Sequence, residues 1–550
     1  MLVLVLCLLG CLLLLLVVDP GRDNGVTGIS LEPTACFNLQ VLRSGAAEVE
    51  VTPHGRCHQW FAGIFTGLPT EGETTIRVRM AGHDIGVNKA NCAKWDGLHP
   101  LLTYADPTRY ESYEGFQRDA RGRWVSNDLF KHGKARFAGR GPTPDQQVIP
   151  PDLAHDFLSP DGNYWFPWRD MLHGEADPNT ATFTLREHFA RPRATVAMHL
   201  PYTMAYHEAF LTRLRAANYP GVSIDLLGHS AEGRPLYMVR VDDPAYPTPL
   251  HWRDTPSSPT VANARHDGEP AFPAGHSAPL ASIDDPPEAE KPRVMLIIAR
   301  EHGTEHAPSW VVQGVLRQLL ADTPESWKLR ERTTWLLLFI YDPDGAANSV
   351  FHALTDRFFP HKNHPVYGSV TPREVIAYVR YLRTFINSGR LMAAVTAFYG
   401  LECTEGETVL CPHVMTQERA LLLDFNAYWF SRLRKLGIPT HAPREPWHEG
   451  HVPYRPHGWC WYWYGAFSPT FEINDRYPAY RLTPEALERL GGHYARTLVA
   501  FLDTPAGKRR VQETRLFLEH RAIERTMWFQ TSMSGTPDDP TLFDMLSMGY

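Results

Sequence analysis

The stretch RVMLIIAREHGTEHAPSWVVQGVLRQLL, residues 293–320, decides the fold class of this chain. It begins with an almost continuous apolar run, residues 293–299, which is typical of a short strand buried on both faces of a sheet. It ends with residues 311–320, where apolar residues recur at the spacing of a helix. Two histidines and two glutamates stand between these segments, within residues 301–306. A strand that leads through a polar connection into a helix predicts an α/β domain.

Two further apolar runs extend this pattern along the chain. Residues 334–341 (TWLLLFIY) and 391–398 (LMAAVTAF) have the same continuous apolar character and predict two more buried strands. Helix starts are predicted at Thr371 and at Thr483, because each threonine can cap a helix and a proline follows it in the first turn. We therefore expect a mainly parallel or mixed sheet flanked by helices.

The N-terminal half of the chain has a different pattern. Residues 28–196 are rich in turns, and segments such as 74–80 (TTIRVRM) and 180–189 (TATFTLREHF) alternate apolar with polar residues. Alternation of this kind predicts half-buried antiparallel strands, and an all-β sandwich is the architecture that fits them. The predicted organisation has four parts: a signal peptide or membrane anchor (1–20), the β-sandwich (28–196), the α/β domain (200–505, with a surface insertion at 243–292), and a C-terminal helix and tail (506–550).

The chain starts with an apolar leader. Leu2–Val18 is almost entirely apolar, and Asp19 ends the run. This length is short for a membrane span and ample for the apolar region of a signal peptide, although no Lys or Arg precedes it. The segment LLGC (8–11) also resembles a lipoprotein signal. We predict an exported or membrane-anchored, extracytoplasmic protein, with residues 2–18 as the tether where the leader is not cleaved.

Length and composition limit the function classes. The 550 residues are enough for two or three domains, and 43% hydrophobic with 21% charged residues indicates a globular chain. A net charge of −7 without a long Lys/Arg block argues against nucleic acid as a partner. The cysteines agree with export, and Cys36 with Cys57 and Cys403 with Cys411 are candidate disulfide pairs. Nothing in the sequence indicates an oligomeric state.

His302 and Glu305 are the strongest candidates for a metal site. They lie three residues apart where the strand ends, a spacing that on a helical turn places both side chains on one face, and imidazole with carboxylate suits Zn²⁺. In one alternative, Glu305 only interacts with the positive end of a helix dipole. In another, H-x-x-E-H (302–306) is an inverzincin motif, in which both histidines bind zinc and the glutamate is the base. Because Gly303 follows the first histidine at once, we favour a strand-to-helix turn and the His302–Glu305 pair.

Seven segments carry a family resemblance by their order and spacing: QWFAGIF (59–65), WDGLHPL (95–101), VAMHLPYT (196–203), LGHSAEGRPLYMVRV (227–241), the stretch 293–320, YDPDGAANS (341–349) and SPTFEIN (468–474). Together they resemble the M14 zinc carboxypeptidases, in particular the cytosolic-carboxypeptidase-like branch, which has an N-terminal β-sandwich. The resemblance extends over most of the chain. It implies a zinc-carboxypeptidase-like mixed sheet for the α/β half.

The resemblance also implies roles for single residues. His302 and Glu305 match the first two zinc ligands, and Glu472 matches the glutamate that serves as general base and acid for the metal-bound water. In this chemistry zinc acidifies the water, a carboxylate accepts the proton, and the metal stabilises the tetrahedral oxyanion. Arg357, in LTDRFF, is the candidate for binding a substrate carboxylate in a bidentate manner.

The resemblance breaks at the third zinc ligand. The family has a histidine at the end of a central strand, and Tyr399 takes that position in AAVTAFYGLECTEG (393–406). A neutral tyrosine is a poor zinc ligand, so another group would have to complete the site, with His306, His413 and Cys403 as candidates. Candidate proton donors are Tyr454, Tyr462 and Tyr464.

The sequence thus predicts a zinc-dependent metallocarboxypeptidase that acts on a peptide or small amide. The alternative is a degenerate M14 fold that binds a peptide or glycan in a cleft lined by the aromatic cluster GWCWYWYGAF (458–467), although the same aromatics also suit a buried core. A serine hydrolase is disfavoured, because Glu232 takes the place of the second glycine in GHSAEG (228–233), which otherwise resembles G-x-S-x-G.

Overall fold

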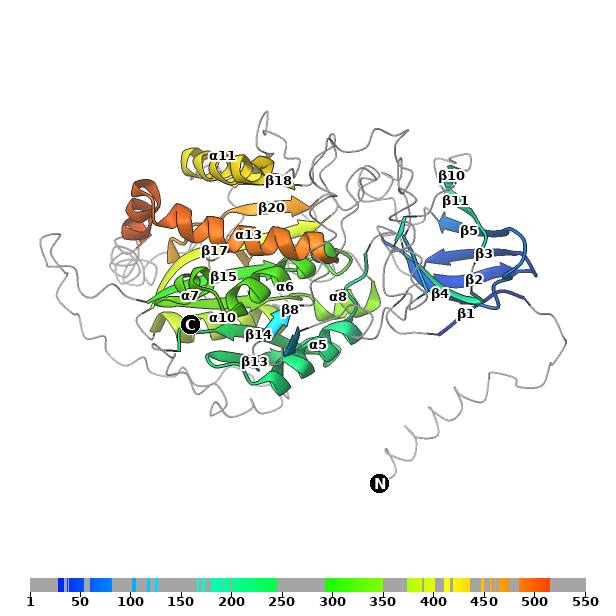
Figure 1. Cartoon of the computed structure of the whole chain (residues 1–550), viewed down its shortest axis with the longest axis horizontal. Helices are drawn as coiled ribbons and strands as arrows, with labels where there is room; N and C mark the ends of the chain where they lie inside the picture. Colours follow the sequence, from blue (N-terminus) through cyan, green and yellow to red (C-terminus); the bar gives the residue numbers. More distant parts are fainter. Residues whose placement is uncertain are drawn as a thin grey trace, which may run out of the picture.

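The structure is a computed structural model, in which a β-rich N-terminal part is followed by an α/β part (Figure 1). It describes residues 28–33, 37, 39–53, 60–81, 101–104, 116–118, 124–126, 166–167, 171–173, 180–189, 191–197, 200–244, 292–349, 373–387, 390–400, 410–415, 419–435, 447–449, 456–457, 460, 464–473 and 484–514. The leader, most of the insertion 243–292, the tail after residue 514 and the candidate disulfide partners Cys36, Cys57 and Cys403 lie outside these residues.

The α/β part is built on one mixed sheet. Its eight strands lie in the order β13-β14-β16-β15-β17-β20-β18-β19, and the central strands β16, β15, β17 and β20 are parallel. The strands are β13 (Val222–His229), β14 (Pro235–Val241), β15 (Arg293–Ala299), β16 (Thr333–Leu338), β17 (Leu391–Gly400), β18 (Leu410–Met415), β19 (Trp447–Glu449) and β20 (Thr470–Ile473).

The three apolar runs of the sequence form the centre of this sheet, which confirms the predicted α/β class. The run 293–299 is β15, 391–398 lies in the longer β17, and the two pair in parallel. The run 334–341 forms β16 only as far as Leu338, because the chain then turns toward the next helix. Alternate residues of these strands enter two separate hydrophobic clusters, one on each face of the sheet, as continuous apolar character predicts.

Helices cover both faces of the sheet (Figure 1). The first cluster includes buried residues of α5, α6, α11 and α13, and the second includes those of α10. The helices are α5 (Met204–Ala217), α6 (Ala307–Leu320), α7 (Pro324–Arg330), α8 (Pro343–Asn348), α10 (Arg373–Asn387), α11 (Arg419–Lys435) and α13 (Pro484–Leu502). No helix among the described residues is long and apolar enough to span a bilayer.

Helices α6 and α13 cross in backbone contact, which fixes α6 behind the polar stretch that precedes it. A Cβ atom on Gly314 would lie 1.9 Å from the carbonyl oxygen of Glu488, and one on Gly491 would lie 1.9 Å from that of Val311. Beside this crossing, Glu488 accepts a hydrogen bond from Gln313 at 2.7 Å. Glycine on both helices therefore permits an approach that no other residue would allow.

The N-terminal part contains two five-stranded sheets, as the alternating pattern predicted. Buried residues of both sheets belong to one hydrophobic cluster, among them Val78 from one sheet and Val196 from the other. The first sheet has the order β1 (Ser30–Leu31), β4 (Ala62–Thr66), β12 (Arg193–Ala197), β6 (Leu101–Thr103) and β9 (Phe166–Pro167). The second has the order β10 (Met171–His173), β11 (Thr180–Glu187), β5 (Thr74–Ala81), β3 (Glu48–Pro53) and β2 (Leu39–Ser44).

Helix α5 joins the two parts of the molecule and carries a buried histidine. Thr203 caps the helix by accepting a hydrogen bond from the backbone N–H of Tyr206 at 3.0 Å. One turn into the helix, His207 is buried, and its Nδ1 lies 3.2 Å from the hydroxyl of Tyr202. Burial, together with the positive charge of Arg300, lowers the pKa of His207 to about 3, so this imidazole is neutral in the folded protein.

We expect His207 to make the protein less stable in mild acid. The unfolded imidazole titrates near 6.5 and the folded one near 3, so between these values the unfolded state binds one more proton and stability falls as the pH falls. The loss is about 1.4 kcal/mol of unfolding free energy for each pH unit below 6.5. Denaturant unfolding at pH 7.5 and 5.5 measures it, and His207→Gln should show a pH dependence weaker by that amount. Equal pH dependence in both proteins would contradict the prediction.

Candidate metal and catalytic site

The candidate site lies where the central parallel strands end. After β15 the chain makes a turn through residues 300–306, and α6 begins only at Ala307. Inside this turn the backbone N–H of Glu305 donates to the carbonyl of His302 at 3.2 Å. Both candidate ligands therefore stand on a strand-to-helix turn, as Gly303 led us to expect, and not within a regular helix.

The turn brings His302 and Glu305 into direct contact. The Nδ1 atom of His302 lies 2.5 Å from Oε1 of Glu305, and the two residues are only 5% and 1% exposed. A buried imidazole and a buried carboxylate that face each other at this distance are a suitable pair of donors for one Zn²⁺ ion. The geometry thus agrees with the predicted pairing, whereas their role as ligands stays a prediction.

Glu472 lies at the same edge of the sheet. Strand β20 runs parallel to β17, with Glu472 in register with Tyr399, and Ala299 at the end of β15 is in register with Phe398. The turn touches β17 as well, since a Cβ atom on Gly400 would lie 3.0 Å from the Cβ of Glu305. Because these strands are parallel, segments that are far apart in the sequence meet at one edge of the sheet.

Tyr399, which we predicted to replace the third ligand, lies in a buried polar network. Its ring centroid lies 5.5 Å from that of His302. Its hydroxyl donates a hydrogen bond to the carboxylate of Glu301 and lies 3.2 Å from Nδ1 of His457, and all three residues of this network are buried. Within the described part of the chain, no three His, Cys, Asp or Glu side chains are grouped so as to hold a metal ion. The described residues therefore fit zinc as a pair of donors and do not form a three-ligand set.

His306 faces away from this pair. Its Nδ1 accepts a hydrogen bond from the backbone N–H of Tyr202 at 2.7 Å, and its ring centroid lies 4.3 Å from that of Trp60 in the N-terminal part. This placement, with α6 starting after the motif, disfavours His306 as a third ligand and disfavours the inverzincin alternative. Tyr464 is buried, and Cys403, Arg357, Tyr454, Tyr462 and the side chain of His413 lie outside what the structure describes.

Arg300 is a buried cation beside the site that the sequence analysis did not identify. It directly follows β15, adopts the left-handed conformation (φ 59°), and is fully buried. Its guanidinium donates to the carbonyl of Tyr202 at 2.8 Å and to the carbonyl of Gly303. Burial lowers the pKa of Arg300 to about 9, against the opposing effect of the carboxylates of Glu305 and Asp342. An arginine at the end of an apolar run was the available signal.

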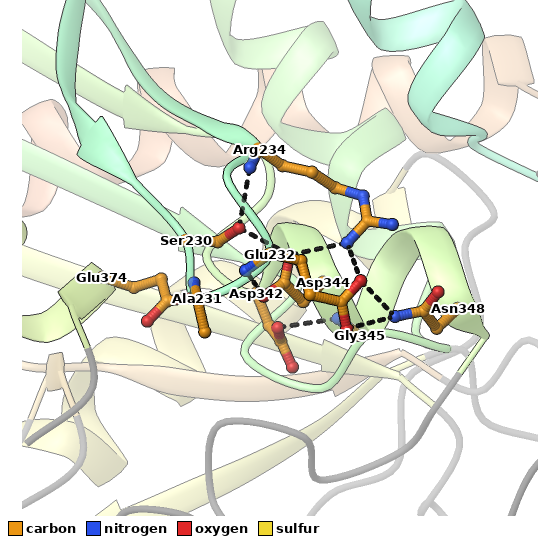
Figure 2. Close-up of polar contacts among 9 residues, drawn as sticks. All are labelled: Ser230, Ala231, Glu232, Arg234, Asp342, Asp344, Gly345, Asn348 and Glu374. Atoms are coloured by element: carbon orange, nitrogen blue, oxygen red, sulfur yellow. Dashed lines mark hydrogen bonds and ion pairs between the residues drawn. The ribbon is translucent and has the colours of Figure 1, made fainter. Parts of the chain in front are cut away.

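A second polar cluster joins the hairpin of β13 and β14 to α8 (Figure 2). The carboxylate of Asp344 in α8 accepts hydrogen bonds from the hydroxyl of Ser230 at 2.5 Å and from the backbone N–H of Glu232 at 3.0 Å. Arg234 donates to the same carboxylate at 2.7 Å. Ser230 is thus a buried donor that fastens the hairpin to α8. This role agrees with rejecting GHSAEG as a nucleophile motif.

The comparisons with known proteins agree with this arrangement. Residues 207–357 match the family model of the zinc carboxypeptidases, Peptidase M14, and this segment contains the turn and α8. This match supports the resemblance to the M14 zinc carboxypeptidases that the sequence motifs indicated. The family is one of metallocarboxypeptidase hydrolases, and zinc is the metal that its description names. The finer branch with an N-terminal β-sandwich remains a prediction.

Solved structures share the fold of this protein. A metallo-carboxypeptidase from Burkholderia cenocepacia is 16% identical, with a TM-score of 0.52 and a match that covers 86% of this chain and 99% of that one. A metallo-carboxypeptidase from Pseudomonas aeruginosa in complex with (2-guanidinoethylmercapto)succinic acid is 15% identical, with a TM-score of 0.52 and coverage of 86% and 99%. At these identities the likeness supports the fold and assigns no residue of the site.

Gly303 allows the turn of residues 300–306 to pack against α8. A Cβ atom on Gly303 would lie 2.0 Å from the carbonyl carbon of Gly345 and 2.5 Å from the backbone nitrogen of Ala346. The backbone of α8 cannot move away easily, since Asp342 accepts a hydrogen bond from Gly345 N–H at 2.8 Å and donates its own N–H to Arg300 at 2.9 Å. Absence of a side chain at residue 303 is therefore a condition for this geometry.

We expect Gly303→Ala to lower the unfolding free energy by about 3 kcal/mol, because the added methyl group meets backbone and not a flexible side chain. Denaturant unfolding followed by circular dichroism measures the loss. Gly45→Ala is the matched control: its new Cβ would lie 3.5 Å from the nearest atom, an ordinary contact, and should cost less than about 1 kcal/mol. Equal stabilities of the two variants would show that the close approach does not constrain the turn.

Proposed function

We propose that this protein hydrolyses a peptide or related amide bond, with zinc held in part by His302 and Glu305 and with Glu472 as the proton-accepting carboxylate. The observation that carries the proposal is the convergence of the buried His302–Glu305 pair and of Glu472 on one edge of the sheet. The match to a zinc hydrolase family supports the type of reaction and the metal.

In the proposed mechanism, the turn holds the metal and strand β20 supplies the general base. Zinc, when bound, would supply acidification of a water molecule and polarisation of the scissile carbonyl. His302 and Glu305 would hold it, since they are buried and in contact with each other. Glu472 would take the proton from water and return it to the leaving amine, the role of a general base that then serves as general acid. Its burial among sheet residues limits competing solvent.

Substrate and location complete the proposal. A peptide or small amide is the proposed substrate, and Arg357 is proposed to bind its terminal carboxylate, as a planar guanidinium can do with two parallel hydrogen bonds. We further propose an exported or membrane-tethered protein, on the apolar character of residues 2–18. Both statements concern residues outside the described part of the chain.

We expect Glu472→Gln to lower the rate of amide hydrolysis by roughly 10²–10⁴-fold, because an amide cannot accept the proton. The assay uses zinc-loaded protein and a panel of N-blocked dipeptides with basic, acidic and apolar C-terminal residues. Bound zinc should stay the same in this variant, since Glu472 is not a proposed ligand. Glu232→Gln, on the partly exposed hairpin, is the control and should retain activity. Unchanged turnover in Glu472→Gln would remove Glu472 from its role.

A non-catalytic M14 fold is the second candidate function. The observation in its favour is Tyr399, whose hydroxyl is bound to Glu301 where the family places a histidine. With two donors in place of three, a zinc site loses much of its affinity and rigidity. Such a protein would bind a peptide or glycan at the same sheet edge without cleaving it.

Metal binding separates the two candidates. We expect zinc in the wild type to be removed by mild chelation, and Tyr399→His to bind it at least about tenfold more tightly, because an imidazole restores a third donor. Tyr399→Phe, which keeps the ring and removes the hydroxyl, is the control and should not gain affinity. Metal content and chelator competition measure both. Tight stoichiometric zinc in the wild type would mean a third ligand from outside the described residues, and no metal in any variant would favour the non-catalytic protein.

A further inference from the structure

The N-terminal β part touches the metal turn through one tryptophan. Trp60 lies two residues before the start of strand β4 and is fully buried. Its ring lies against the imidazole of His306, with centroids 4.3 Å apart and the planes inclined by 31°. On the side of its own domain it lies 6.1 Å from Phe37. Trp60 thus contacts His306, the last residue of the turn that carries the candidate ligands, although Trp60 precedes His302 by 242 positions in the chain.

Polar contacts continue from His306 into the middle of the turn. Its Nδ1 accepts the backbone N–H of Tyr202, so the ring proton of the neutral imidazole is on Nε2. Arg300 places one guanidinium nitrogen 3.5 Å from the same Nδ1 and donates with it to the carbonyl of Tyr202. Its other terminal nitrogen donates to the carbonyl of Gly303. The path from Trp60 therefore ends at Gly303, which directly follows His302.

The turn depends on such contacts because neither the strand ladder of β15 nor the helical bonds of α6 include its central residues. Arg300 has a backbone conformation that costs energy for any residue other than glycine, and it persists only where the surroundings determine it. Its surroundings are Tyr202, His306 and Gly303, all of them buried or in the turn itself. The contacts that hold His306 and Arg300 in place therefore also determine the conformation of the turn.

We propose that Trp60 is a positioning residue for the metal site, through which the N-terminal β part sets the geometry of the His302–Glu305 turn by way of His306 and Arg300. The inference rests on the proposed function in one respect, that the turn carries the ligands. Partners that orient ligands without touching the metal commonly contribute 10- to 100-fold in metal affinity. The β part would then belong to the catalytic unit and not serve as an independent module.

The first test measures the turn in the metal-free, full-length protein by hydrogen exchange of the backbone amides in residues 301–306. Trp60→Leu should accelerate exchange there by about tenfold or more, whereas Trp60→Phe, which keeps an aromatic face against His306, should restore most of the protection. Trp335→Leu is the matched control: Trp335 is equally buried, but in β16, where its indole donates to the carbonyl of Leu329. It should leave exchange in 301–306 unchanged. Trp60→Met, whose longer and more flexible side chain adapts better to the space, replaces Trp60→Leu should that variant not fold.

The second test measures zinc affinity by chelator competition on the same variants. Trp60→Leu should weaken binding 10- to 100-fold, with Trp60→Phe close to wild type and Trp335→Leu unchanged. Unaltered exchange and unaltered affinity in Trp60→Leu would overturn the inference and leave the proposed function standing. Accelerated exchange in 301–306 with no zinc bound by the wild type would support the positioning role and overturn the metal in the proposed function. Equal acceleration by Trp335→Leu would also overturn the inference, because it would show general destabilisation.

Discussion

The backbone contact between Gly303 and Gly345 is the constraint on which the site depends. The two glycines stand on the connections that follow the neighbouring parallel strands β15 and β16, and parallel strands release their connections at the same edge. The connections can pack in layers only if one of them has no side chain at the crossing. Once they do, Asp342 binds the backbone on both sides of the contact, and Asp344 binds the hairpin of β13 and β14. The turn with His302 and Glu305 is thereby enclosed by backbone and buried polar groups.

The same edge explains how residues far apart in the sequence meet. Strands β15, β17 and β20 are parallel and in register near their ends, so the turn after Ala299, Tyr399 and Glu472 arrive side by side. Burial of both faces of the sheet makes this register firm, because slipping a strand by one residue would exchange its two faces. Rigid strands position the residues of such a site, so these residues do not have to be close in sequence. The loops around the site can therefore differ.

The sequence predicted the strands and the His302–Glu305 pair because both are local patterns. Continuous apolar runs marked β15 and β17 correctly, and spacing with a following glycine placed the pair on a turn. The end of β16 was missed, since Phe339, Ile340 and Tyr341 remain apolar and buried after the strand has ended, and Tyr341 already donates its N–H to Ala299. The contacts of Trp60, Arg300 and His457 were missed for a different reason. They join separate segments, and no periodicity or motif in a single sequence records them.

Tyr399 belongs to a buried hydrogen-bond network. Its hydroxyl is the donor to a buried carboxylate, Glu301, and lies beside a buried imidazole, His457. A buried carboxylate and imidazole need polar partners, since burial without them costs about 1–3 kcal/mol or more for each group. A histidine at position 399 would direct a ring nitrogen toward the metal pair only by giving up part of this network. The tyrosine is therefore built into its surroundings, and the predicted ligand pair and glutamate share their sheet edge with this hydrogen-bond network.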